Sequence, residues 1–553
     1  MTARSEIETL LNGSITEDKD ALKKFIESNT ATFNFAFLDL NSSRKRLLDK
    51  LFNYLQLEDA RDMHRDCLIA VRILSRDKKD LDNILDLKHL DLLKKFAGLD
   101  TNCTASEDKI DHELEIEAQK CLCNIIYNSH VAAAYCSKNG IIEGVIERIK
   151  KYKRFKKIPL DIKIFDMKIL FLITALCDET RPKLKEDLHG LKYLTEVLEH
   201  LTTDDKESGP NGGASSAPVQ KKISKEESNY ACEVLKVLFN LTVSQNLSSQ
   251  PDEEEESRYK ELVAILRDML VVKIEDQNTK LELTNNIVNL ITNMPTSTYS
   301  ALHRPVKDEE KIPKKFQFDG QDMRAVKEIL VLLENKFSTE IAVRSQTEIL
   351  SPILTVLVKG VSSDRYLRKY LRQNILPPLR DVHTRPEEGN TLRNNLCRLL
   401  TTTITHVRDL AADLLFILCK ENVGRMIKYT GYGNAAGLFA NRGLLGGGRP
   451  GERRYSSESE DSDTEEYREH KHGINPVIGC YEQPKTNPMA HMTEEQKEYE
   501  AMKLVDLMDT LTRTGIIQPC KIGEDGRPEP IEHVLQLQEG IPAQQVRRNQ
   551  DDD

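Results

Sequence analysis

The stretch 427–467 holds the residues whose types and spacing come nearest to a chemical motif. Gly431, Gly433 and Ala436 stand in the order GYGNAA, which loosely resembles a dinucleotide-binding fingerprint. That fingerprint needs a strand before the glycines, and here an apolar pattern of helical spacing precedes them. No phosphate loop, zinc-protease helix, metal-spaced CxxC pair or GxSxG nucleophile occurs, and His470 and His472 lie in a polar loop without companion ligands. We therefore expect no covalent catalysis, no metal and no cofactor.

An acidic serine cluster follows the glycines. Ser457 and Ser462 each have a glutamate three residues later, an arrangement that acidophilic kinases of the casein-kinase type favour. Each phosphate would add about −1.5 to −2 charges. A basic partner is available in SDRYLRKYLRQ (363–373), whose spacing places four cations on one helix face: Arg365, Arg368, Lys369 and Arg372. The alternative is an acidic solvated linker whose serines are incidental.

The elements that must position these segments are predicted to be helices. Apolar residues recur at i, i+3, i+4 and i+7, the pattern of an amphipathic helix. The repeated segments are Ile69–Leu74, Ala118–Ile126, Ile169–Cys177, Val234–Leu241, Leu283–Ile291 and Ala411–Cys419. Several recur at intervals of roughly 50 residues, close to the ~40–47 of armadillo and HEAT repeats. We therefore predict an all-α, right-handed superhelix over residues 1–428, with a disordered Gly/Pro/Ser-rich loop at about 202–222.

Three of these predicted helices share a polar position. Asn124, Asn240 and Asn289 each fall six residues after the start of the apolar stripe, on the edge away from the core, and Arg72 occupies the same register. An asparagine amide offers two donors and an acceptor, which suits the backbone of a bound peptide. The alternative is that each amide bonds a neighbouring loop of its own chain. Both interpretations remain open at this point.

The tail beyond the repeats divides into three parts. Residues 429–492 are predicted to be a glycine-rich and acidic linker. A capping box at 493–496 then starts a helix that runs to about Arg513 and is closed by Gly515, within a segment 493–514. Its apolar stripe consists of Leu504, Leu507, Met508 and Leu511. A lone amphipathic helix must pack on its own body or on a partner, and residues 515–553 are predicted to be polar and largely disordered.

Composition narrows the class of protein. The net charge of −10 over 553 residues argues against a general nucleic-acid binder, which usually carries a basic surplus. Most of the eleven cysteines lie inside apolar helical segments, which favours free thiols in a reducing compartment over disulfides. Neither a signal peptide nor an apolar run of the ~18–20 residues that span a bilayer is present. We therefore expect a soluble, cytoplasmic protein.

Several strings in the sequence resemble one known family. They are AVRILSRD (70–77), KCLCNII (120–126), EVLKVLFNLT (233–242), LPPLRDVHTRPEEG (376–389), IKYTGYGNAAGL (427–438), NPMAHMTEEQKEYEAMKLV (487–505) and IIQP (516–519). Together they are similar to synembryn, the resistance-to-inhibitors-of-cholinesterase family of chaperones and exchange factors for heterotrimeric G-protein α subunits. The resemblance runs from about Arg44 to Pro519 and is closer to the A-type member.

This resemblance implies a mechanism. The concave face of an armadillo/HEAT superhelix would capture the C-terminal helix of a GDP-bound or nascent Gα subunit, so that GDP leaves and a nucleotide-free complex persists until GTP binds. A partner shifts Gα in this way only by preferring its open state. Recruitment to the cell cortex would follow from binding Gα.

The resemblance also assigns residues. Arg72, Arg76, Asn124 and Asn240 match the family's inward-facing positions, and we extend the assignment to Asn289. The helix 494–513 would grip the nucleotide-binding domain of Gα. Ser457 and Ser462 match two activating phosphosites, although the neighbouring serines at 456 and 459 depart from the more acidic family pattern.

Two other classes of protein remain as alternatives. One is a passive armadillo scaffold or transport adaptor that only carries peptides, which would have no need of a second gripping helix beyond a phospho-regulated linker. The other is an enzyme that binds nucleotide at its glycine-rich loop, which would bind GDP or GTP without Gα.

Overall fold

The computed structural model describes residues 10–13, 15–35, 38, 42–100, 111–152, 158–203, 221–243, 252–307, 312–339, 342–446, 463–483, 489 and 491–531. The chain forms two compact units. Unit 1 comprises residues 1–316 and 327–332, and unit 2 comprises residues 317–326 and 333–553. The described parts of both units are built mainly from helices, which confirms the predicted all-α, armadillo/HEAT-type class.

Unit 1 consists mainly of helices. Its α-helices are α2 (Ile15–Asn29), α4 (Ser43–Tyr54), α5 (His64–Leu74), α6 (Leu81–Ile84), α7 (Leu87–Phe96), α8 (His112–Asn128), α9 (His130–Cys136), α10 (Ile141–Lys151), α11 (Leu160–Leu176), α12 (Thr180–Pro182), α13 (Gly190–Thr202), α14 (Lys225–Thr242), α15 (Glu253–Val271) and α16 (Gln277–Thr292). Short elements complete it: η2 (Glu58–Met63), the π-helical η4 (Lys183–Asp187), η5 (Thr296–Leu302), β1 (Arg304–Pro305) and η6 (Lys314–Phe316).

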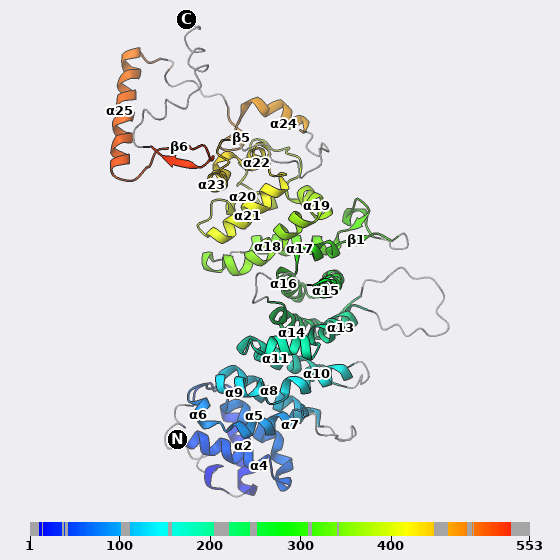
Figure 1. Ribbon diagram of the computed structural model, residues 1–553. Coiled ribbons are helices and arrows are strands. Elements are labelled where there is room, and N and C mark those ends of the chain that lie inside the picture. The colour runs from blue at the N-terminus through cyan, green and yellow to red at the C-terminus, as the bar shows by residue number, and fades with distance from the viewer. Residues whose placement is uncertain are drawn as a thin grey trace. The chain divides into compact units, whose positions relative to one another are not determined.

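The helices of unit 1 stack in two layers. One layer is a row in which each helix packs on the next, in the order α5, α8, α11, α14, α16 (Figure 1). The other layer covers the row from one side: α7 packs on α8, α10 on α11, α13 on α14, and α15 on α16 and η5. We call α5, α8, α11, α14 and α16 the row helices. The predicted stripes 69–74, 118–126, 169–177, 234–241 and 283–291 all lie on them.

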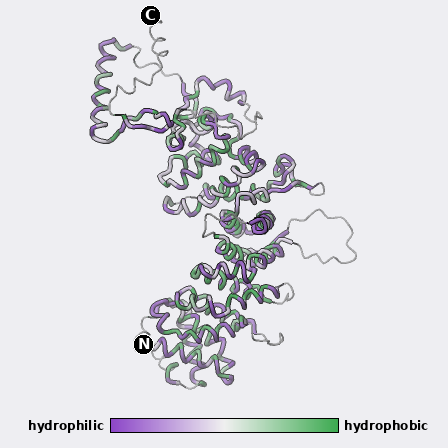
Figure 2. Tube along the Cα trace, in the orientation of Figure 1, coloured by the Kyte–Doolittle hydropathy of each residue, from purple (hydrophilic) through white to green (hydrophobic). Residues whose placement is uncertain are grey.

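Local sequence explains why these helices start and pack where they do. Ser224 and Glu227 form a capping box at the start of α14, and the Asp252 carboxylate accepts the Glu255 N–H at the start of α15. The acidic segment 252–256 is therefore a helix start. In Figure 2 hydrophobic and hydrophilic residues alternate along the helices, as amphipathic packing requires. Each fully buried leucine or isoleucine contributes about 2 kcal/mol.

A polar cluster lies inside this core. The Asp166 carboxylate on α11 accepts hydrogen bonds from Arg148 (3.0 Å), Gln119 (2.7 Å) and the Tyr152 hydroxyl (2.7 Å). Burial raises the pKa of Asp166 to about 6, although Arg148 and the hydrogen bonds oppose the shift. Three elements, α8, α10 and α11, are therefore joined through one buried carboxyl.

Unit 2 continues the helical pattern and then carries the tail. Its helices are part of α17 (Arg324–Ser338), then η7 (Val343–Ser345), α18 (Gln346–Ser363), α19 (Arg365–Ile375), α20 (Leu392–Leu399), α21 (Thr405–Leu418), α22 (Val423–Thr430), α23 (Tyr432–Arg442), α24 (Glu465–His470), η8 (Lys471–Gly473) and α25 (Glu494–Arg513). Three antiparallel strand pairs accompany them. They are β2 (Gln317–Phe318) with β3 (Gln321–Asp322), β4 (Ile474–Asn475) with β5 (Cys480–Tyr481), and β6 (Cys520–Ile522) with β7 (Pro528–Pro530).

The first part of the glycine-rich stretch is helical where the sequence predicts a linker. Gly431 separates α22 from α23, at φ 73° and ψ 150°, a conformation that glycine adopts far more readily than other residues. The segment 432–442 then forms α23, whose Ala435 and Phe439 are buried. The helical body therefore extends to Arg442, and the boundary predicted at 428/429 is too early. Buried apolar contacts outweigh the low helix propensity of glycine here.

The segment 463–481 docks on α22, α23 and the loop 379–389. The N–H of Tyr432 donates to the Pro476 carbonyl (2.8 Å) and the N–H of Gly433 to that of Val477 (2.9 Å). The Tyr481 N–H donates to the Val382 carbonyl (2.7 Å). A side chain at Gly479, which has φ 73°, would meet Pro386 Cγ at 2.7 Å and the Gly431 backbone at 2.9 Å. This close approach needs glycine on both sides, and part of the predicted linker is therefore an ordered element.

The tail helix lies where the sequence predicts it. Thr493 and Gln496 form its capping box, and Gly515 adopts φ 72° just beyond its end. The following segment departs from the prediction of a polar, largely disordered end, because 520–530 forms the β6–β7 hairpin. The Leu445 N–H donates to the Gly526 carbonyl (3.2 Å), which attaches the hairpin to the end of α23. Of the predicted loop 202–222, residues 204–220 lie outside the described residues.

Replacing Asp166 by asparagine should change the pH dependence of stability. Because the folded state binds this proton more tightly than the unfolded chain, the contribution of Asp166 is complete below about pH 4 and is lost as pH rises through about 6. The free energy of unfolding of the wild type minus that of Asp166→Asn should therefore fall by about 2–3 kcal/mol over that range. Urea unfolding followed by circular dichroism measures it. Asp161→Asn, exposed on the same helix, is the control, and a constant difference for Asp166→Asn would contradict the raised pKa.

Replacing Gly479 by alanine should detach the segment 474–481 while the helical repeats stay folded. The added Cβ would collide with Pro386 and with backbone at Gly431, and the positive φ costs a further 1–2 kcal/mol or so. Amide hydrogen exchange should then quicken at Tyr432 and Gly433, whose acceptors are lost. Gly437→Ala is the matched control, since nothing lies within 4 Å of its added Cβ. Unchanged protection in Gly479→Ala would show that the docking does not depend on this contact.

Candidate protein-binding surface

Asparagines connect neighbouring row helices in unit 1. The Asn124 amide donates to the Arg72 carbonyl of α5 (3.1 Å). The Asn240 amide donates to the Thr174 hydroxyl (3.0 Å) and the Phe171 carbonyl (3.3 Å) of α11. Each amide therefore bonds its own chain, as in the alternative interpretation, but its partner is the preceding helix rather than a neighbouring loop.

The structure corrects two details of the predicted asparagine row. Asn240 is only 8% exposed and lies within the contact between helices, where the sequence predicts an edge away from the core. Asn293, rather than Asn289, makes the equivalent bond on α16, to the Thr242 hydroxyl (3.1 Å) and the Phe239 carbonyl (3.2 Å). Asn289 lies one turn earlier and is half-buried. The position of the bonded asparagine on each helix is set by the contact with the preceding helix. Counting residues from the start of an apolar stripe does not detect that contact.

The two predicted arginines lie close to Asn124. Arg72 forms an ion pair with Glu117 of α8 (2.9 Å), and Lys120 pairs with the same carboxylate (2.7 Å). Arg76 donates to the Thr30 carbonyl (2.6 Å) and stacks over the exposed ring of Phe33. Burial and the neighbouring Arg72 lower the pKa of Arg76. The structure thus brings Asn124 into contact with Arg72 and places Arg76 near Arg72.

Sequence reasoning missed a set of lysines on the same helices. The Lys120 and Lys168 ammonium groups lie 5.8 Å and 5.0 Å from the centre of the Phe165 ring, and Lys236 lies 5.5 Å from that of Phe171. These distances permit cation–π attraction. The sequence contained a signal for them, because Lys120 and Lys236 each precede one of the bonded asparagines by four residues.

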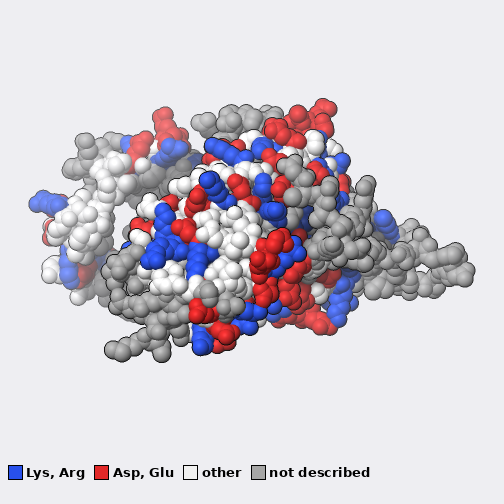
Figure 3. All heavy atoms as spheres, turned by 90° about the horizontal axis from the view of Figure 1, so that it is seen from below, with Lys and Arg blue, Asp and Glu red and all other residues white. Residues whose placement is uncertain are grey.

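Figure 3 shows that positive and negative side chains are interspersed on the face that it draws, so this face does not have a single sign of charge.

The tail helix α25 exposes its predicted apolar stripe. None of its residues is buried. Leu504, Leu507 and Met508 are 58%, 54% and 40% exposed, and Leu511 is half-buried. A helix with a stripe of this kind in water is stabilised mainly when the stripe is covered. Among the described residues, the stripe is not buried against the helical body, which is one of the two predicted outcomes.

The predicted basic face of α19 is only partly a surface. Arg372 is 6% exposed, and its guanidinium donates to the Leu418 carbonyl (2.7 Å) and the Tyr429 hydroxyl (3.3 Å). Arg368 donates to the Val361 carbonyl (2.8 Å), and Lys369 lies 3.7 Å from Asp319. The prediction that these side chains share an exposed face with Arg365 is wrong for Arg372, which bonds a carbonyl and a hydroxyl inside the unit.

Ser457 and Ser462 lie outside the described residues, but Asp463 follows directly. Its carboxylate lies 2.6 Å from Lys428 and 3.6 Å from Lys471. A hydrogen bond from Lys428 is the main cause of a lowered Asp463 pKa. An anion at the end of the serine cluster is therefore held by lysines of α22 and η8.

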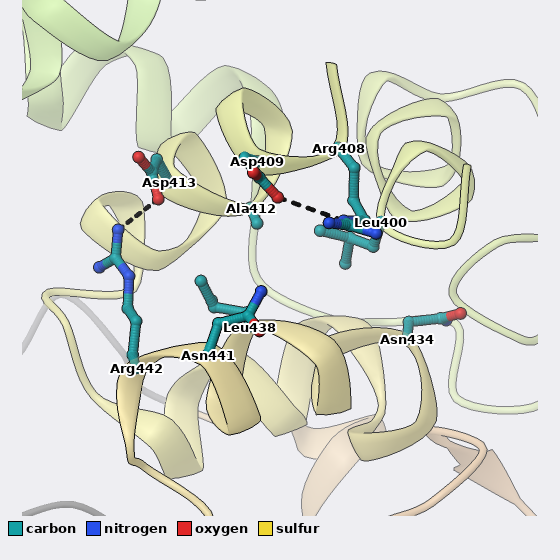
Figure 4. A pocket seen from close by; sticks show the side chains of 9 residues that line it. All are labelled: Leu400, Arg408, Asp409, Ala412, Asp413, Asn434, Leu438, Asn441 and Arg442. Atoms are coloured by element: carbon teal, nitrogen blue, oxygen red, sulfur yellow. Dashed lines mark hydrogen bonds and ion pairs between the residues drawn. The ribbon is translucent and has the colours of Figure 1, made fainter. Parts of the chain in front are cut away.

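The glycine motif does not form a nucleotide site. The N–H groups of Tyr432 and Gly433, which a phosphate would need, already donate to Pro476 and Val477. A cavity of about 240 Å³ lies beside α23, lined by α21 residues including Arg408, Asp409 and Asp413, and by Asn434 and Arg442 (Figure 4). Arg442 pairs with Asp413, so much of the charge around the cavity is internally neutralised. In the described part of the chain, no cluster of three or more His, Cys, Asp or Glu residues is arranged to hold a metal ion.

The described cysteines are all free thiols, and nearly all of them are buried or half-buried. None of the described helices combines the length and the apolar content needed to cross a membrane.

Comparisons with known proteins agree with the resemblance read from the sequence. The family model described as guanine nucleotide exchange factor synembryn matches residues 67–527. Chaperone Ric-8 of Drosophila pseudoobscura pseudoobscura is 39% identical over 567 residues, covering 96% of each chain. Chaperone Ric-8A of Xenopus tropicalis is 40% identical with 93% of each chain covered, and that of Gallus gallus is 38% identical with 97% of each covered. The chain belongs to the synembryn family of guanine nucleotide exchange factors.

Proposed function

We propose that this protein is an exchange factor and folding chaperone for heterotrimeric G-protein α subunits. The observation that carries the proposal is the tail helix α25, which exposes a leucine and methionine stripe and has no buried residue. A stripe of this kind is suited to a partner, and membership of the synembryn family supports a Gα subunit as that partner. A passive peptide carrier would have no use for such a helix beyond its repeats.

The row helices are the proposed site for the C-terminal helix of Gα. Arg72, Arg76, Lys120 and Lys168 supply cations there, and Phe165 and Phe171 supply apolar surface. Asn124 and Asn240 serve the site indirectly, because their amides hold the row helices in register. Asn289 remains a proposed contact residue on α16. A charged and aromatic surface suits a partner helix that ends in polar and apolar residues.

Exchange by this route requires no reacting group on the protein. A surface that binds Gα with its C-terminal helix withdrawn stabilises that state relative to the GDP-bound one, and the nucleotide leaves as a consequence. A shift of 1:99 to 99:1 would need a preference of about 5.5 kcal/mol. The row helices and α25 would be two separate binding sites for one Gα molecule. Binding at one site raises the effective concentration of Gα at the other, so the two sites together can supply this preference. The same grip would support a Gα subunit that has not yet bound nucleotide.

Phosphorylation of Ser457 and Ser462 by an acidophilic kinase is the proposed regulation. Asp463, next to Ser462, lies between Lys428 and Lys471, which supports anion binding at this point. Arg365, Arg368 and Lys369 remain candidate contacts for a phosphate. Arg372 is no longer a candidate, because it is buried against Leu418 and Tyr429.

The direct test mixes the phosphorylated full-length protein with GDP-loaded Gα and follows uptake of a GTP analogue. We expect uptake to accelerate at least ten-fold over Gα alone, because the nucleotide-free state is stabilised. The Ser457→Ala, Ser462→Ala double variant, treated with the same kinase, should stimulate less. Uptake that stays at the basal rate for every Gα class would overturn the proposal. Binding of GDP or GTP by the protein alone would favour a nucleotide-using enzyme instead.

Replacing Leu504 and Met508 of α25 by aspartate should weaken the contact of Gα with α25 without affecting its contact with the row helices. The variant should lose about ten-fold or more in exchange rate, because two exposed apolar contacts are removed and like charges are added. Binding of a C-terminal Gα peptide to the row helices should be unchanged. Asp506→Ala, on the opposite side of the same helix, is the control for helix integrity. Equal exchange rates for the double variant and the wild type would show that α25 is not a grip.

A further inference from the structure

A tyrosine and a methionine in the first half of α25 are more exposed than its apolar stripe. Tyr499 and Met502 are 68% and 69% exposed. They lie three residues apart, so they share one face of the helix. At 3.6 residues per turn, this face lies about 130–170° around the helix axis from the middle of the stripe. A partner that covers the stripe therefore leaves both side chains accessible.

The charge around Tyr499 is acidic. Within four residues of it stand three exposed carboxylates, those of Glu495, Glu498 and Glu500, against two lysines. Glu500 lies 3.7 Å from Lys503, whereas Glu495 and Glu498 form no ion pair with another described residue. Two carboxylates beside the tyrosine are therefore available to a basic partner.

The first half of α25 can also open into an extended segment. None of its residues is buried, so its capping box and internal hydrogen bonds support it without tertiary packing. A helix of this length without such packing is only marginally stable in water. Tyr499 and Met502 both precede the stripe, which begins at Leu504. Opening of residues 494–503 therefore presents the tyrosine to an enzyme that binds extended chain and leaves the stripe residues in place.

We propose that Tyr499 is phosphorylated by an acid-directed protein tyrosine kinase, one that favours carboxylates beside the tyrosine. The basic groove of such a kinase is complementary to Glu495 and Glu498. In the reaction, the Tyr499 hydroxyl oxygen forms a bond to the γ-phosphorus of ATP, and the bond from that phosphorus to the β,γ-bridging oxygen breaks. ADP leaves, and the phenolic proton passes to the carboxylate base of the kinase. Neither the family comparison nor the sequence motifs assign a role to this tyrosine.

The phosphorylated segment fits a phosphotyrosine-binding domain of the SH2 type. A domain of this type holds the phosphate, which carries about −1.5 to −2 charges, with an arginine cluster. Members that also select an apolar residue three positions after the phosphotyrosine would take Met502 in their pocket. The inference does not depend on capture of Gα, because Tyr499 lies off the stripe. It gives α25 a second partner on its other face.

The first test incubates the full-length protein with ATP and the catalytic domain of an acid-directed tyrosine kinase, and locates the phosphate by mass spectrometry. We expect Tyr499 to be the main site, so that Tyr499→Phe loses most of the incorporated phosphate. Tyr127→Phe is the matched control, since Tyr127 is as exposed but has no acidic residue within four positions. Phosphate that is absent from Tyr499, or no more abundant there than on Tyr127, would overturn the proposal.

The second test titrates the phosphorylated full-length protein with an isolated SH2 domain that selects methionine three residues after the phosphotyrosine. Binding should require the phosphate, and Met502→Ala should weaken it about ten-fold, the loss of one apolar anchor. Met489→Ala, an exposed methionine outside α25, should bind as the wild type does. Equal affinity of phosphorylated and unphosphorylated protein would overturn the proposed recognition. Neither test contains Gα, so failure here is distinct from failure of nucleotide exchange.

Discussion

The contact between successive row helices is the constraint on which unit 1 depends. Each row helix is apolar on more than one side, because it packs on both neighbours in the row and on the outer layer. Within these apolar contacts, an asparagine reaches from one helix to a carbonyl near the end of the preceding one, as Asn240 does to Phe171. A buried amide that finds no partner is costly. One register between neighbouring helices is therefore favoured, and the repeats cannot slide past one another without losing these bonds.

The same bonds determine what the surface of the row can offer to a partner. An asparagine that holds two helices in register has at least one of its amide donors occupied by its own chain, as Asn124 and Asn240 do. In the proposed function, recognition is assigned instead to Arg72 of α5, to Arg76 just beyond its end, and to the lysines over Phe165 and Phe171. Lys120 and Lys236 each lie about one helical turn before a bonded asparagine on the same helix.

In unit 2, the short helix α23 provides both attachments of the tail. Its first N–H groups have no intrahelical acceptor and instead donate to the carbonyls of Pro476 and Val477. The turn of the β6–β7 hairpin meets the chain just beyond its last residue, through Leu445 and Gly526. The segment between these attachments carries α25. Glycines at 431 and 479 permit the first attachment because backbone meets backbone there. An exposed apolar helix is thereby held at a helical body without being buried in it.

Much of the fold could be predicted from local sequence. Apolar spacing located the row helices, the capping box at Thr493 located the start of α25, and the short motifs placed the chain in its family. Each of these depends on residues within one or two helical turns of each other, so the linear order of residues is sufficient. The apolar stripe of α25 was readable for the same reason, since residues three and four apart on a helix share a face.

Tertiary contacts decided the remaining features. The glycine-rich stretch became α23 because Phe439 and Ala435 find a buried environment and the tail supplies acceptors for its first N–H groups. Asn293, rather than Asn289, belongs to the asparagine row because its amide bonds a carbonyl of α14. Arg372 is not part of the basic face because its guanidinium bonds a carbonyl of α21. The position of a lysine over a phenylalanine of the next helix is likewise invisible in the linear order. Periodicity reports which side of a helix is buried, whereas the partner of each polar group depends on the register between helices, which is set only when they pack.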